Sequence, residues 1–357
     1  MAYYKDRLSL ILDSYENIDL FRLSKGNIIR YHFDRKIKGS KEEHIIKEVF
    51  EEYDVTIDEQ DTLYIVHQDR DFHLILTLIE KNKRPESIKL TKDPILGIHY
   101  LNLFLIENMP HIIYAIPIPK GEKRYRIYHN YFHNGEWLTS IIDRIESKEL
   151  LKPVEIFNHS NKIFLAYYDK MEEEEIYIRE WDKKGNKWQG KIKLTDNKED
   201  KLFLDLVVIE SKIHLTYCQY QEGNLVVKYE RFNYQYGLAI REVEKILSNP
   251  ENPQDPILIY YHGKLWVIWV EQDRVHSRYS EDLGNNWSPI YLWNDSIGKT
   301  IVRYKYFKLN EADKILNYSF GKIEPEIEFI GFGTLENITE VPLKKKGYPV
   351  FKINPKI

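Results

Sequence analysis

Three carboxylate residues of this chain each lie a short way before an apolar, strand-like stretch: Glu155, Asp205 and Asp255. Strands that begin around one opening would bring such carboxylates together. Two carboxyl groups about 5–10 Å apart can cleave a glycosidic bond, one as the acid and the other as the base or nucleophile. These three residues are therefore the candidates for catalysis.

Other polar side chains are expected near the same opening. Asp19 also lies a short way before such an apolar stretch and is expected at the same opening. Arg22 and Arg303 lie close by, and His99 is a further candidate for ligand binding. An arginine beside the carboxylates could hold an anionic sugar. The alternative is that the mouth of a channel is wet, so charged residues line it without any chemistry. Both interpretations stay open, and we favour the solvated lining.

The placement of these residues depends on a repeated apolar strand. Copies of this strand occur at 27–33, 72–78, 111–116, 162–168, 212–218, 264–270 and 314–320. Four of the six steps between copies are 50 to 52 residues, which is the length of four short strands with their turns. The repeat predicts an all-β propeller of seven blades, with six as the alternative, in which each blade is a four-stranded antiparallel sheet.

Turns and proline-rich connectors predict the limits of the blades within a single domain. The expected blades are 16–54, 55–92, 97–147, 151–196, 202–248, 255–295 and 301–340, followed by a tail at 341–357. The first two blades are compressed, and one strand of the first is expected to be lost or irregular. Residues 7–13 precede the first inner strand as outer strands do elsewhere, so we expect them to complete the last blade and close the ring.

One segment of the first blade has two readings. Ser40 and Glu43 could form the capping box of a helix, with apolar residues at helical spacing after it. The stretch 44–51 also matches 140–147, which stands where an outer strand is expected. We favour the strand.

The stretch SEDLGNNW at 280–287 has the spacing S-x-D-x-G-x-x-W, formed by Ser280, Asp282, Gly284 and Trp287. The chain here resembles the Asp-box, or bacterial neuraminidase repeat, propellers, which include sialidases and non-catalytic binding proteins. In that family the box lies on the face opposite the catalytic one. The resemblance implies a folding role, with a left-handed glycine, an aspartate that accepts turn amides and a packed tryptophan.

The resemblance also implies what a sialidase-like enzyme should contain: an arginine triad, a tyrosine and glutamate pair, an aspartate acid and an early Arg-Ile-Pro signature. No Arg-Ile-Pro triplet occurs, and the nearest string, YRIYH at 125–129, falls in an expected third strand. We therefore favour a non-catalytic binding or scaffold protein that recognises a glycan, peptide or protein partner at the channel mouth. A sialidase-like glycoside hydrolase is the alternative.

Composition excludes several other classes. The 52 basic and 56 acidic residues give a net charge of −4, so no global field favours nucleic acid or an anionic membrane. Cys218 is the only cysteine, and we predict that it is a small buried apolar side chain. We expect neither a metal site nor a cofactor. The N-terminal sequence has no signal-like apolar core and no apolar run spans a membrane, so a cytoplasmic protein is expected. The oligomeric state stays open.

Overall fold

The computed structural model describes residues 6–36, 39–119, 123–147, 154–159, 162–308, 314–324 and 326–344. Within these ranges the chain is all-β, with one short 3-10 helix at Asn294–Ser296. The 27 tyrosines and 15 phenylalanines of the sequence suit pleated, half-buried surfaces. The part of the chain that is described contains no helix long and apolar enough to cross a membrane.

Consecutive strands of the first half pair antiparallel with one another in groups of four. The first group contains β1 (Leu8–Leu12), β2 (Ile18–Ser24), β3 (Asn27–Phe33) and β4 (Lys41–Ile46). The second contains β5 (Val49–Ile57), β6 (Leu63–Asp69), β7 (Leu74–Ile79) and β8 (Glu86–Lys89). The third contains β9 (His99–Ile106), β10 (Met109–Pro117), β11 (Arg124–His133) and β12 (Glu136–Glu146).

The second half continues the same pattern. The fourth group contains β13 (Val154–His159), β14 (Lys162–Lys170), β15 (Glu174–Asp182), β16 (Lys187–Trp188) and β17 (Ile192–Lys193). The fifth contains β18 (Lys201–Ile209), β19 (Lys212–Gln221), β20 (Asn224–Gln235) and β21 (Leu238–Ile246). The sixth contains β22 (Gln254–Tyr261), β23 (Lys264–Glu271), β24 (Arg274–Ser280), β25 (Ile290–Trp293) and β29 (Ile338–Val341). The last contains β26 (Val302–Lys308), β27 (Tyr318–Lys322) and β28 (Glu328–Ile330), and these three strands share one seven-stranded sheet with β1–β4.

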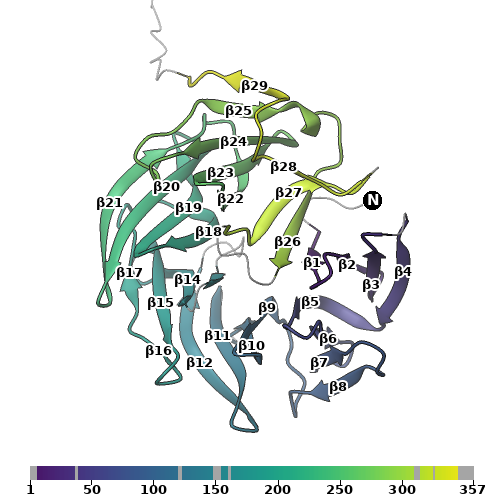
Figure 1. Cartoon of the computed structure of the whole chain (residues 1–357). Helices are drawn as coiled ribbons and strands as arrows, with labels where there is room; N and C mark the ends of the chain where they lie inside the picture. Colours follow the sequence, from purple (N-terminus) through teal and green to yellow (C-terminus); the bar gives the residue numbers. More distant parts are fainter. Residues whose placement is uncertain are drawn as a thin grey trace, which may run out of the picture.

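The sheets stand around a common centre in a propeller-like arrangement (Figure 1). The first strands, such as β5, β9, β18 and β22, lie toward the centre, and β4, β8, β12 and β21 lie at the rim. The first strands of neighbouring groups contact one another, as β5 does with β9 and β18 with β22. The residues at the start of each first strand therefore converge on the centre.

The position of the N-terminal strand differs from the expectation. β1 pairs antiparallel with β2 and parallel with β26, with Leu8 opposite both Arg22 and Tyr304. Residues 7–13 therefore do not form the outer strand of the last unit, and that prediction was wrong. The burial of β1 gives the reason: four of its five residues are buried, whereas outer strands such as β21 leave most of their residues exposed or half-exposed.

The expected limits of the first two blades are also wrong. The copies at 27–33 and 72–78 are β3 and β7, the third strands of their groups, whereas the later copies are second strands. The first two groups are therefore short but complete, and no strand of the first is lost. The expected boundary after residue 54 is wrong because β5 spans Val49–Ile57. The stretch 44–51 is strand, with a break at Glu48, whose φ is 60°.

The core lies between neighbouring sheets. The largest apolar cluster combines side chains of the fourth, fifth and sixth groups, including Tyr217, Cys218 and Trp269, which are fully buried. Cys218 is free, and burial holds the pKa of its thiol well above the ordinary value. The single cysteine thus serves packing, as the sequence predicted.

The SEDLGNNW stretch forms the turn between β24 and β25. The Ser280 hydroxyl donates to the Asp282 carboxylate at 2.7 Å and accepts the Gly284 N–H at 2.7 Å. Asp282 also accepts the backbone N–H of Asn286 at 2.8 Å, and this hydrogen bond, followed by that of Ser280, lowers the pKa of Asp282 to about 2. The Trp287 ring packs edge-on against Tyr229 of the neighbouring group, 4.9 Å between centroids. The turn thereby joins two sheets.

Candidate functional site

A cavity of about 570 Å³ lies at the centre, where the first strands of the groups begin. Residues of β1, β5, β9, β13, β18, β22 and β26 all contribute to its wall. Five aromatic side chains line it: Tyr53, Tyr100, Phe203, Tyr220 and Tyr318. A volume of this size is in the ordinary range of small-ligand sites, about 300–1,000 Å³.

Charged side chains of both signs share this wall. The acidic ones are Asp6, Asp54, Glu155 and Asp255, and the basic ones are Arg7, Arg303 and Lys305. Arg7 forms an ion pair with Glu52, and Lys305 forms one with Asp54. Two of the three basic groups are therefore neutralised by carboxylates of the protein itself.

An irregular backbone at the start of several first strands turns side chains toward the cavity. Tyr100, Phe203 and Asp255 have φ of 54°, 60° and 48°, and all three line the wall. The pairing registers of β9, β18 and β22 shift at these positions. Because a β-bulge re-aims the side chain of its extra residue, the bulges explain how successive groups each present one residue to the centre. Nothing in the sequence pattern predicted them.

Two inner-strand aspartates hold neighbouring sheets together. The Asp54 carboxylate accepts the Leu103 N–H, and the Asp205 carboxylate accepts the Leu258 N–H, each at 2.6 Å. Both aspartates are almost fully buried, at 4% and 2% exposure. A carboxylate that accepts a buried backbone N–H from the next sheet stabilises the contact between the two sheets.

Only two of the three catalytic candidates line the cavity. Glu155, at 3% exposure, and the more accessible Asp255 both line the cavity. Asp205 is not part of the wall and serves the inter-sheet hydrogen bond with Leu258. The structure therefore brings two of the three carboxylates into one cavity.

Arg303 and Tyr318 pack against each other in the wall. The guanidinium carbon of Arg303 lies 3.7 Å from the centroid of the Tyr318 ring. Burial, followed by the negative charge of Glu155, raises the pKa of the Tyr318 phenol far above its ordinary value, and this phenol therefore stays protonated. Tyr318 belongs to the second strand β27, so counting back to inner strands could not identify it.

The other binding candidates lie outside the cavity wall. Asp19 lies in a separate groove of about 610 Å³, where Arg30 and His32 both contact its carboxylate at 2.7 Å. It belongs to β2 rather than to an inner strand, because the first unit begins one strand earlier than expected. Arg22 lies 3.8 Å from Asp6, at the edge of the site.

His99 is also outside the wall. Its ring packs edge-on against Tyr125, with centroids 6.3 Å apart. Burial lowers the pKa of this imidazole, with a smaller and opposite contribution from Glu51. As for metals, the described ranges hold no group of three or more His, Cys, Asp or Glu side chains that could bind an ion.

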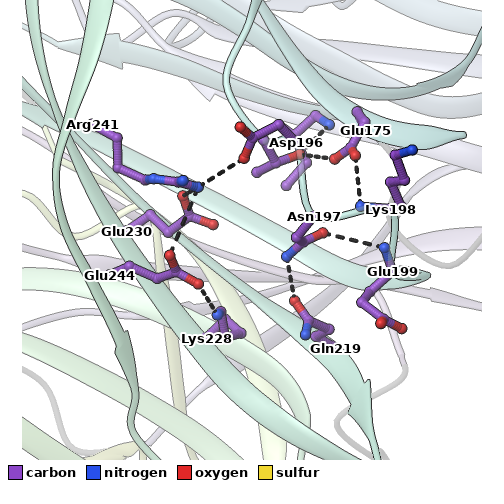
Figure 2. Close-up of polar contacts among 12 residues, drawn as sticks. Glu175, Asp196, Asn197, Lys198, Glu199, Gln219, Lys228, Glu230, Arg241 and Glu244 are labelled. Atoms are coloured by element: carbon purple, nitrogen blue, oxygen red, sulfur yellow. Dashed lines mark hydrogen bonds and ion pairs between the residues drawn. The ribbon is translucent and has the colours of Figure 1, made fainter.

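A second polar cluster lies between the fourth and fifth groups (Figure 2). Glu175 accepts the Lys198 N–H at 2.8 Å, and the Arg241 guanidinium donates to Asp196 at 3.1 Å and to Glu230 at 3.2 Å. Burial raises the pKa of Glu230. These carboxylates are already bound by partners within the protein, so the cluster stabilises the contact between sheets.

The chain is similar in structure to several solved proteins, but no family is assigned to it. No protein-family model and no curated protein matches the chain. A variant of the Aleuria aurantia lectin in complex with α-methyl-L-fucoside is 10% identical, with a TM-score of 0.49 over 81% of this chain and 96% of that one.

Two further solved structures are similar at the same level. A triple mutant of AofleA from Arthrobotrys oligospora is 11% identical, with a TM-score of 0.47 over 84% of this chain and 88% of that one. An ulvan lyase bound to a glucuronate and sulfated rhamnose unit is 11% identical, with a TM-score of 0.46 over 81% and 78%. At these values the likenesses assign neither a family nor a ligand to this chain.

Proposed function

We propose that the protein binds a glycan in the central cavity without transforming it. The observation that carries this proposal is the wall itself, where five aromatic rings stand among carboxylates and cations. Sugar rings pack on aromatic faces, and their hydroxyl groups need donors and acceptors of hydrogen bonds. The sequence also allowed a peptide or protein partner, but a cavity of about 570 Å³ suits a small polar ligand better.

The proposal includes a propeller of seven blades. The seven-stranded sheet contains one parallel pair, β1 with β26, and all its other pairs are antiparallel. Dividing the sheet at that pair makes β1–β4 one blade and β26–β28 another. The Asp-box resemblance at 280–287 agrees with such a fold, and in that family the box lies on the face opposite the catalytic one.

Binding is tested on a glycan array with the purified protein and a variant of a cavity aromatic. Tyr220 lines the wall and is 44% exposed, so Tyr220→Ala removes a ring without disturbing the core. We expect about tenfold weaker glycan binding for this variant. Tyr15→Ala is the matched control, because Tyr15 is exposed and lies outside the wall. Failure of the intact protein to retain any glycan contradicts the proposal.

The second candidate function is a glycoside hydrolase of the sialidase-like kind. It is favoured by one observation, namely that Glu155 and Asp255 line the same cavity. A panel of fluorogenic glycosides distinguishes the two functions. We expect binding without hydrolysis of any glycoside. If the protein does hydrolyse a glycoside, and Glu155→Gln and Asp255→Asn each abolish that hydrolysis, the enzyme is the correct function and the non-catalytic binding protein is rejected.

A further inference from the structure

The outermost strand of the fifth group, β21, presents apolar side chains on an unpaired edge. Leu238 and Ile240 are 66% and 65% exposed, and within the described part of the chain β20 is the only strand that pairs with β21. Two other outer strands have protected edges, because β8 has only four residues and β4 begins with Lys41, Glu42 and Glu43. A long edge with exposed apolar residues needs a strand that covers it.

The C-terminal part of the chain already covers one such edge. β29 pairs antiparallel with β25 and forms the outermost strand of the sixth group (Figure 1). From β29 the chain runs to the connector that follows β21, where Asn249 donates to the Pro342 carbonyl at 3.0 Å and accepts the Lys344 N–H at 2.8 Å. Lys344 also forms an ion pair with Glu251. The described chain therefore ends, at Lys344, beside the C-terminal end of β21.

The sequence after Lys344 has the pattern of an edge strand. Residues 348–355 are YPVFKINP, in which every second residue is apolar: Pro349, Phe351, Ile353 and Pro355. In an antiparallel pair, alternate residues direct their N–H and C=O groups toward the neighbouring strand, and the residues between them direct these groups away. The two prolines are an even number of positions apart, so both can occupy the side that donates no N–H to a neighbour.

The backbone of β21 has the matching register. Gln235 pairs with Leu238 across a two-residue turn in which both residues have a positive φ, 52° and 75°. Because such a turn closes on a hydrogen-bonded pair, Leu238 and, two residues later, Ile240 direct their N–H groups toward β20. The N–H groups of Ala239 and Arg241 then point outward. The exposed apolar residues of β21 thus lie where an added strand makes no hydrogen bonds, which is the position that prolines require.

We propose that residues 348–355 of the chain bind along the outer edge of β21 as an additional antiparallel strand. Residues 345–347 connect Lys344 to the end of β21, and the pairing sets Ile353 opposite Ile240. The outward N–H groups of β21 are donated to carbonyl oxygens of this segment. The same end of the chain that covers the edge of the sixth group thereby covers the edge of the fifth.

Amide-resolved hydrogen exchange tests this proposal on the full chain and on a variant that ends at Lys344. We expect the Ala239 and Arg241 amides to exchange about tenfold faster, or more, in the shortened protein, because they lose their hydrogen-bond acceptors. The amides of β12, the outer strand of the third group, are the internal control and should exchange alike in both proteins. Equal rates at Ala239 and Arg241 in the two proteins overturn the proposal.

Two point variants test the register and keep the full length of the chain. Lys352→Pro removes an N–H that faces β21, so we expect the same faster exchange at Ala239 and Arg241. Lys352→Thr is the matched control, since it removes the same charge, keeps the N–H and should exchange as the native protein does. Identical exchange in the two variants overturns the inference. Protection that depends on protein concentration, with a dimer in sedimentation, assigns the edge to a second copy of the chain and also overturns it.

Discussion

At the scale of single residues, Gly284 occupies the tightest point of the turn between β24 and β25. Its φ is 95°, and a Cβ atom there would lie 2.0 Å from the Tyr229 hydroxyl of the neighbouring sheet. We expect Gly284→Ala to lower the free energy of unfolding by about 2–4 kcal/mol, from backbone strain and overpacking together. Urea denaturation measures this loss.

The matched control separates the two causes. Gly223 has a similar φ of 87°, but nothing lies within 4 Å of an added Cβ. Gly223→Ala should therefore cost only the strain of a left-handed alanine, about 1–2 kcal/mol. Equal losses for both variants would mean that the contact with Tyr229 does not matter.

At the scale of elements, Lys201 joins the fourth and fifth groups of strands. Its Nζ lies 2.9 Å from the Glu175 carboxylate, and the two side chains are 0% and 2% exposed. Lys201→Met leaves the Glu175 charge buried without its cation, so we expect a loss of about 3–5 kcal/mol in the free energy of unfolding. Chemical denaturation monitored by tryptophan fluorescence measures it.

Two further variants test whether this loss comes from the unpaired charge. Adding Glu175→Gln to Lys201→Met removes the charge and should recover part of the loss. Lys83→Met breaks the exposed pair with Glu80 and should change stability by less than about 1 kcal/mol. If all three variants behave alike, the buried pair contributes no more than a surface pair.

At the scale of the whole molecule, buried neutral histidines predict loss of stability in acid. Trp188 donates to His129 at 3.2 Å, so His129 carries its proton on the other nitrogen and donates to His111 at 2.9 Å. Burial lowers the pKa of His111 to about 3 and that of His129 well below its ordinary value. His67 and His276 are lowered to about 4, again by burial.

Because burial lowers the pKa of these histidines, the protein loses stability as the pH falls. Below about pH 6.5 the unfolded chain binds protons on histidines that the native protein keeps neutral, so stability is full above that pH and declines toward the folded pKa. We expect the free energy of unfolding to fall between about pH 7 and pH 5, by about 1–2 kcal/mol for His111. His111→Phe should remove that share of the decline.

Urea titrations at several pH values provide the measurement. His44→Gln is the control because His44 is exposed, with 48% of its side chain accessible, and it should leave the pH dependence unchanged. A native protein whose stability is constant over this range contradicts the burial of neutral histidines.

Local patterns in the sequence determined the β class and the places of the later strands. Alternation of apolar and polar residues depends on neighbours along the chain, and so does the turn at 280–287, whose hydrogen bonds join residues at most four positions apart. For this reason Glu155 and Asp255, counted back from second strands that were correctly identified, do line the cavity.

The tertiary structure alone decided the rest. Residues 27–33 have the same pattern as a second strand, and only the pairing of β1 with β2 and β26 shows that they form a third strand. Asp19 was misplaced for that reason. Tyr318 comes from a second strand and reaches the centre beside Arg303, a contact that no local pattern encodes. Side chains from strands far apart in the sequence meet there because the sheets stand around one centre, and that arrangement depends on long-range pairing and packing.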